Sequence, residues 1–191
     1  VIADAASGQF DITDEEQAAL RYNYATIEPG DLLTNIAPAN RIYAVARSDY
    51  IHPLFGLDSE ILTKDWSVDH PHHRGIYWAW PEVDWRGQRG DLHALQHVFA
   101  KPAGRCLTTG GQVFAQIEAD NVWKRETGEA LVQEKAVIRL YHATGDDRRM
   151  CGCDRARPPA HRRRGVDAAP SGRSRRRPAA GERSAVAALR P

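Results

Sequence analysis

The sequence of 191 residues has few cysteines and no long apolar run, and both absences exclude whole classes of protein. Of its three cysteines, Cys106 stands alone, while Cys151 and Cys153 form a single C-x-C pair. A disulfide framework or a structural zinc site needs more cysteines at suitable spacings, so neither is predicted. A membrane-spanning helix needs about 20 predominantly apolar residues, and no segment approaches that length. The sequence also lacks a Gly-rich phosphate loop and internal repeats.

The last 46 residues lack aromatic residues, isoleucine and lysine. They contain 13 arginines and five acidic residues, a net charge of +8, whereas residues 1–145 contain 13 basic and 20 acidic residues, a net charge of −7. Arg, Ala, Pro and Gly make up 31 of these 46 residues, so the segment cannot bury enough apolar surface to offset the entropy of ordering. We therefore predict one domain over residues 1–145 and a disordered tail over residues 146–191.

Two interpretations of the tail are open. A basic arm would use the arginine triplets at 162–164 and 175–177 to neutralise the phosphates of a nucleic acid. The complete lack of lysine instead favours GC-rich DNA read in a shifted frame, since such DNA encodes mainly Arg, Ala, Pro and Gly. On the second interpretation the tail carries no function, no nucleic-acid partner is expected, and the domain is the incomplete N-terminal part of a longer one.

Alternating apolar and polar residues predict that the domain consists of antiparallel strands. Residues 113–120 and 132–140 both alternate in this way, and Gly128 lies in the turn between them, which predicts a hairpin. Shorter alternations at 9–12 and 20–24 predict a second pair of strands. Residues 91–100 instead fit a helical stripe in which His93 and His97 share one face. The predicted fold class is all-β and antiparallel.

Residues 69–80 concentrate titratable and aromatic side chains. Five of these side chains fall within six residues, and they are Asp69, His70, His72, His73 and Arg74. Pro71 disfavours a helical backbone at His70, so this part is predicted to be extended, with His70 and His72 on one side and His73 on the other. Gly75 permits a turn or a close backbone approach, and residues 76–80 are predicted to form a buried strand.

A metal site is one interpretation of these histidines. Neutral imidazole binds Zn, Cu, Fe or Ni, and three protein ligands with one open position form a typical catalytic site. His70 and His72 would chelate the ion together with a third histidine, and Glu118 or Glu134 would orient a ligand. The alternatives for the third ligand are His93, His97 and His52. The predicted function is then a metal-dependent hydrolase or an oxidoreductase of the oxygenase type.

Acid–base chemistry on a carbohydrate-like small molecule is a second interpretation, and it needs no metal. His70, His72 or His73 would transfer protons because imidazole titrates near neutral pH. Arg74 would bind an anionic or hydroxyl-rich group, and Asp69 would orient an imidazole. The other residues expected to line the site are His52, Trp78 and Trp80. Without catalysis the same site would make a sugar-binding module, and a purely structural role would pair Arg74 with Asp69 instead.

Four short motifs resemble the signature of the soluble PmoA-like family of bacterial proteins. They are SDYIHPL at 48–54, LTKD at 62–65, DHPHHRG at 69–75 and WAW at 78–80, and the similarity covers residues 9–145. The resemblance implies an antiparallel β-sandwich similar to the supersandwich of sugar mutarotases, of which this chain would form only part. It favours a sugar-like substrate over a metal. The cofactor, either none or a divalent transition metal, and the compartment, cytoplasm or periplasm, stay open.

Overall fold

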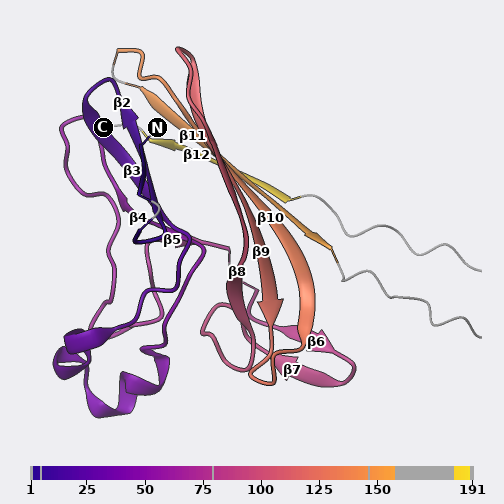
Figure 1. The fold of residues 1–191 in the computed structure, drawn as a ribbon. Coiled ribbons are helices and arrows are strands. Elements are labelled where there is room, and N and C mark those ends of the chain that lie inside the picture. The colour runs from indigo at the N-terminus through magenta and orange to yellow at the C-terminus, as the bar shows by residue number, and fades with distance from the viewer. Residues whose placement is uncertain (1, 5, 79, 146, 158–182, 190–191) are drawn as a thin grey trace, which may run out of the picture.

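Antiparallel β-sheet accounts for most of the regular structure in the computed structural model, which describes residues 2–4, 6–78, 80–145, 147–157 and 183–189 (Figure 1). The first sheet has the order β1-β2-β3-β4-β5, with strands β1 (Ile2–Asp4), β2 (Gln9–Asp14), β3 (Gln17–Asn23), β4 (Tyr50–Leu54) and β5 (Ile76–Tyr77). The second has the order β12-β11-β10-β9-β8, with strands β8 (Phe99–Thr109), β9 (Phe114–Lys124), β10 (Ala130–Tyr141), β11 (Arg148–Arg157) and β12 (Arg183–Leu189). A small hairpin joins β6 (Val83–Trp85) and β7 (Gln88–Gly90).

Helical structure in the described residues is confined to two short 3-10 helices, η1 (Gly30–Asn35) and η2 (Pro38–Tyr43). Within the same residues, no helix combines the length and the apolar character needed to cross a membrane. The predicted all-β, antiparallel fold class is therefore confirmed.

The predicted hairpin is formed by β9 and β10, and its register follows from the alternation of apolar residues. Ile138 lies opposite Ile117, and Ala136 lies opposite Ala119. All four side chains are fully buried, because a strand places every second residue on the same face. This face of the second sheet is its inner face.

The two sheets pack face to face around one hydrophobic core, which makes the fold a β-sandwich. Ile12, Leu20 and Ile51 of the first sheet belong to one hydrophobic cluster. Ile117 and Ile138 of the second sheet belong to the same cluster. Burial of each large aliphatic side chain contributes about 1.5–3 kcal/mol relative to exposure. In Figure 1 the strands of the first sheet lie beside the upper half of the long, bent strands of the second.

A second, smaller cluster lies where the loop between β7 and β8 packs on the second sheet. Leu92 and Leu95 of this loop contact Trp123 of β9. The helical stripe at residues 91–100 does not correspond to a helix, because the loop folds as a turn closed by pairing of Asp91 with Gln96. The Asp91 carboxylate accepts a hydrogen bond from the Ala94 N–H at 2.8 Å, a local contact that competes with helix formation.

Strand β11 extends the second sheet beyond residue 145, where the sequence predicts the domain to end. It pairs with β10 from Gln133 opposite Arg157 to Leu140 opposite Met150, and β12 pairs with β11 in turn. The predicted boundary follows from the low apolar content of the residues after 145. Antiparallel pairing, however, is made by backbone N–H and C=O groups, so a strand can pair there despite its composition. Residues 158–182 and 190–191 of the predicted tail, including both arginine triplets, lie outside the described residues.

Candidate metal centre

The His-rich segment forms a turn, and this brings its three imidazoles together. The His73 N–H donates to the His70 carbonyl at 2.9 Å. The ring centroids are 4.5 Å apart for His72 and His73, 5.0 Å for His70 and His73, and 6.0 Å for His70 and His72. The prediction that His73 faces away from the other two is therefore wrong. Pro71 occupies the second position of this turn, where its fixed φ is favourable, and an extended strand is not needed to accommodate it.

Gly75 holds the end of this segment against strand β4. Its φ is +71°, and its N–H donates to the Lys64 carbonyl at 2.9 Å. A Cβ added at this position would lie 2.1 Å from the Ile51 carbonyl oxygen, so only glycine permits so close an approach. The close backbone approach predicted for Gly75 is confirmed. The strand predicted over residues 76–80 is shorter, because among the described residues of this segment only Ile76–Tyr77 pairs with β4.

A fourth imidazole reaches the cluster from the loop between β7 and β8. The ring centroid of His93 lies 5.0 Å from that of His72 and 5.7 Å from that of His73. One ring nitrogen from each of His72, His73 and His93 lies within 4.8 Å of the other two. The structure thus groups His73 with His72 and His93, whereas the sequence pattern places His70 in that position.

The other two histidines weighed as third ligands have different partners. His97 is exposed, and its Nδ1 lies 3.3 Å from the Glu126 carboxylate. The Nδ1 of His52 lies 2.9 Å from the Thr63 hydroxyl oxygen. Neither belongs to the group of three close ring nitrogens.

Tyr77 and Arg47 fix the position of His93. The Tyr77 hydroxyl lies 3.1 Å from His93 Nδ1, which leaves Nε2 of this ring for a ligand. The Arg47 guanidinium donates to the backbone carbonyls of Leu92, at 3.0 Å, and His93, and its Cζ lies 3.9 Å from the Tyr77 ring centroid. Arg47 is only 4% exposed, and this burial lowers its pKa to about 10. The sequence places Tyr77 in a buried strand and so does not predict its contact with His93, and no motif singles out Arg47.

The two glutamates weighed as orienting partners bind elsewhere. The Glu118 carboxylate accepts hydrogen bonds from Gln116, at 2.7 Å, and Lys135, at 3.1 Å. The buried Glu134 carboxylate accepts a hydrogen bond from the Trp123 indole N–H. The hydroxyl of Tyr77 therefore occupies the position that a carboxylate was expected to take beside a ligand.

His72 has the properties of a metal ligand. Its Nδ1 is buried and has no hydrogen-bond partner among the described residues, although a buried polar group without a partner costs about 1–3 kcal/mol. Burial, followed by the neighbouring His73, His93 and His70, lowers the pKa of His72 to about 4. Burial also lowers the pKa of His93. His72 is therefore neutral at pH 7, and the neutral imidazole is the form that binds a metal.

Arg74 is fully buried, and its partners belong to the protein interior. Its guanidinium donates to the Asp65 carboxylate and to the Tyr50 hydroxyl, and it stacks on Trp66 with its Cζ 3.4 Å from the ring centroid. The alternative pairing with Asp69 is wrong, because the carboxylate beside Arg74 is that of Asp65. A role for Arg74 in substrate binding stays a prediction.

Asp69 and the two tryptophans lie around the cluster in different ways. Asp69 is exposed, with a carboxylate oxygen 3.3 Å from His70 Nδ1, and its hydrogen bond from Ser67 is the main cause that lowers its pKa to about 2. Trp78 packs against the main core. Trp80 is 43% exposed and forms an edge contact with Trp123 at 5.6 Å. The role of all three in substrate binding stays a prediction.

The fold and the site define an antiparallel β-sandwich with a cluster of imidazoles held in loops at its side. The model of a family of unknown function, DUF6807, matches residues 9–154, and the chain belongs to this family. The match contains the whole imidazole cluster and ends within β11. Comparisons with curated proteins and with solved structures give no match. The resemblance to the PmoA-like family and to sugar mutarotases stays a prediction.

Proposed function

We propose that the protein is a metal-dependent enzyme acting on a small molecule, with a divalent transition metal held by His72, His73 and His93. The observation that supports this most is the approach of three ring nitrogens to within 4.8 Å of one another. Bonds of about 2.0–2.1 Å in a tetrahedral site place ligand nitrogens roughly 3.4 Å apart. The ring nitrogens would therefore approach one another by up to about 1.4 Å around an ion.

Each protein group has a part in this arrangement. Tyr77 engages Nδ1 of His93, which leaves Nε2 for the ion, and Arg47 holds the backbone of the same residue. His72 contributes a neutral imidazole with an unpartnered nitrogen, and the exposed His73 completes the set. Three protein ligands leave one position open for water or substrate. A metal bound there would polarise a substrate oxygen or activate a water, which suits a hydrolase and also an oxidoreductase.

The same electrostatics weigh against metal-free acid–base catalysis by His72. A general acid or base works best when its pKa lies near the working pH, and the pKa of His72 is about 4. Closely packed imidazoles hinder protonation of one another, whereas a metal ion benefits from all of them being neutral. The carbohydrate-like substrate implied by the family resemblance is compatible with such a centre and is part of the proposal only as a substrate class.

Metal binding to the purified, chelator-treated protein tests the proposal. Calorimetry with Zn²⁺ and with Co²⁺, checked by metal analysis, should show one equivalent bound. His72→Ala and His93→Ala should each weaken binding at least about a hundredfold, because each removes one of three ligands. His97→Ala is the matched control, since it removes an exposed imidazole outside the cluster.

Two results would contradict the metal centre. If the wild type binds less than about a tenth of an equivalent of each metal, the proposed site does not exist. Equal weakening by His97→Ala and His72→Ala would mean that the metal binds histidines without regard to the cluster. Sugar binding that persists after chelation but is lost in His72→Ala, with no turnover before or after, would instead favour the sugar-binding module.

A further inference from the structure

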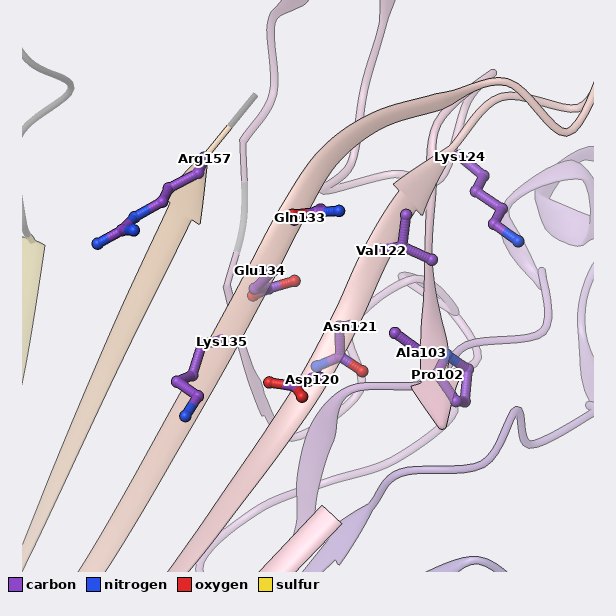
Figure 2. A pocket seen from close by; sticks show the side chains of 10 residues that line it. All are labelled: Pro102, Ala103, Asp120, Asn121, Val122, Lys124, Gln133, Glu134, Lys135 and Arg157. Carbon is purple, nitrogen blue, oxygen red and sulfur yellow. The ribbon is translucent and has the colours of Figure 1, made fainter. Parts of the chain in front are cut away.

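A groove of about 870 Å³ runs across the second sheet, and none of its lining residues belongs to the imidazole cluster. Figure 2 shows its side chains on four neighbouring strands, from Pro102 on β8, through β9 and β10, to Arg157 at the end of β11. The polar residues that matter for its chemistry are Asp120, Lys124, Gln133, Lys135 and Arg157.

The pairing of the strands places these five side chains on the outer face of the sheet, with Arg157 and Lys124 at opposite ends of the groove in Figure 2. Successive side chains of a strand point to opposite faces of the sheet. Ile117 and Ala119 of β9 are in the core, so the even-numbered residues Asp120 and Lys124 face outward. The same holds on β10, where Gln133 and Lys135 are the outward residues. Gln133 lies opposite Arg157, and Lys135 lies opposite Asp120.

An irregularity in β8 forms one wall of the groove. The register changes from Pro102 opposite Asn121 to Cys106 opposite Ala119, so that residues 103–105 all lie beside Asp120. Tyr24 of the other side of the sandwich fixes this bulge, because its hydroxyl accepts a hydrogen bond from the Gly104 N–H at 2.9 Å and donates to the Asp120 carbonyl at 3.1 Å. Bulges commonly re-aim side chains at binding sites.

The lining presents more positive than negative charge and holds several unengaged groups. Lys135 contacts Glu118 at 3.1 Å, on the same outer face. Among the described residues, no hydrogen bond or ion pair engages the side chains of Lys124, Gln133 and Arg157. The Asp120 carboxylate supplies an acceptor in the same groove, and none of the described residues that line it is aromatic. These groups suit a strongly hydrated ligand with an anionic group and several hydroxyls, and they do not suit a flat ring.

We propose that this groove binds a hydroxylated organic anion, a sugar acid of the gluconate or glucuronate class. Arg157 would donate charge-assisted hydrogen bonds to the carboxylate, and Gln133, which lies opposite Arg157, would add an amide donor. Lys124, at the other end of the groove in Figure 2, would donate to a hydroxyl of the ligand and add to the positive charge that attracts it. The Asp120 carboxylate would accept a hydrogen bond from a hydroxyl of the same ligand. The proposal does not depend on the metal centre.

Binding of four small probes tests the chemistry of the groove. Calorimetry or ligand-observed NMR with gluconate and glucuronate should show saturable binding that weakens as salt is raised. Glucose should bind at least about tenfold more weakly, because it cannot use the cationic groups. Inorganic phosphate should also bind more weakly than the sugar acids, since it has no alcohol hydroxyl for Asp120.

Conservative variants separate the groove from other charged surfaces. Lys124→Gln and Arg157→Gln should each weaken gluconate binding about tenfold. Asp120→Asn should weaken gluconate binding and leave phosphate binding unchanged or stronger. Lys64→Gln is the control, because Lys64 is exposed and outside the groove. Thermal melts of all four variants confirm that they fold.

The outcomes that overturn the proposal are distinct. Absent sugar-acid binding overturns it, as does glucose binding as tightly as gluconate. Equal affinity for phosphate and gluconate with no effect of Asp120→Asn would reduce the groove to a general anion patch. Equal weakening by Lys64→Gln would have the same meaning. His72→Ala should leave gluconate binding unchanged, so the failure of this proposal and that of the metal centre are distinguishable.

Discussion

The orientation of His93, one of the proposed metal ligands, depends on a single group, the hydroxyl of Tyr77. Tyr77→Phe keeps the ring beside Arg47 and removes the contact with His93 Nδ1. Loss of such a supporting hydrogen bond typically costs 10–100-fold in metal affinity, so we expect Zn²⁺ binding to weaken by at least about tenfold. The measurement is calorimetric titration of the chelated protein.

Tyr43→Phe supplies the matched control for this change. The Tyr43 ring lies 5.6 Å from the His72 ring, but its hydroxyl has no hydrogen-bond partner among the described residues. Its removal should leave Zn²⁺ affinity unchanged. If both variants bind Zn²⁺ like the wild type, Tyr77 does not position His93 for a metal.

Asp49 is a buried carboxyl group that makes stability depend on pH. It is 4% exposed, accepts a hydrogen bond from the Tyr22 hydroxyl at 2.6 Å, and has its pKa raised above the ordinary value, mainly by burial. A carboxyl with a raised folded-state pKa binds more protons in the folded than in the unfolded protein. Its contribution to stability is therefore full below about pH 3.9 and is lost as pH rises through the raised pKa.

Asp49→Asn should remove this part of the pH dependence. Asn tolerates the φ of +63° at this position and can still accept the Tyr22 hydrogen bond. Relative to the wild type, the variant should gain stability as pH rises from 4 to 8, by about 1.4 kcal/mol for each unit by which the pKa is raised. Urea unfolding at several pH values measures this difference. Asp58→Asn, at an exposed position, should show no such trend, and parallel curves for Asp49→Asn and wild type would contradict the prediction.

At the scale of elements, Gly75 ties the His-rich turn to the first sheet. Gly75→Ala combines an unfavourable φ of +71° with a Cβ that would lie 2.1 Å from the Ile51 carbonyl oxygen. We expect a loss of at least about 2 kcal/mol in the free energy of unfolding, together with weaker metal binding, because β5 must move away from β4. Urea unfolding and Zn²⁺ titration measure the two effects.

Gly128→Ala separates backbone strain from steric overlap. Gly128 has a φ of +86°, but no atom lies within 4 Å of an added Cβ. This control should lose only about 1 kcal/mol and should bind Zn²⁺ normally. Equal losses for the two variants would mean that the close approach to Ile51 has no energetic importance.

The elements differ in how far the sequence predicts them, and the physical reason is locality. The hairpin of β9 and β10 follows from alternation within each strand, and each strand carries enough apolar residues to fix its inner face. The turn at His70–His73 depends on one backbone hydrogen bond that the presence of Pro71 permits but does not require. Strand β11 pairs with β10 through backbone hydrogen bonds, and the amino-acid composition of the segment does not predict this pairing.

The candidate site is harder to predict than the sheets, because its parts meet only in the folded protein. The sequence singles out His72 and His73 as neighbours, and His93 enters only as one of several alternatives. Its place is set by Arg47, which precedes β4 and reaches the carbonyls of Leu92 and His93. No periodicity in the sequence relates these distant segments, so Arg47 and Tyr77 are not predicted.

At the scale of the whole molecule, a metal ion at the cluster would join two separate parts of the sandwich. His72 and His73 precede β5 of the first sheet, whereas His93 precedes β8 of the second. Binding to the folded state alone stabilises it by about 2.7 kcal/mol at a free metal concentration one hundred times the Kd. The melting temperature of the wild type should therefore rise steadily with Zn²⁺ concentration.

The same melts show whether the two proposed sites are independent. His72→Ala should lose the rise with Zn²⁺, while His97→Ala should keep it. Gluconate in the outer groove should stabilise the wild type and His72→Ala by equal amounts, because ligands at separate, uncoupled sites contribute additively. A gluconate effect that disappears in His72→Ala would show that the ligand binds at the imidazole cluster, and the sugar acid would then be a ligand of the metal centre.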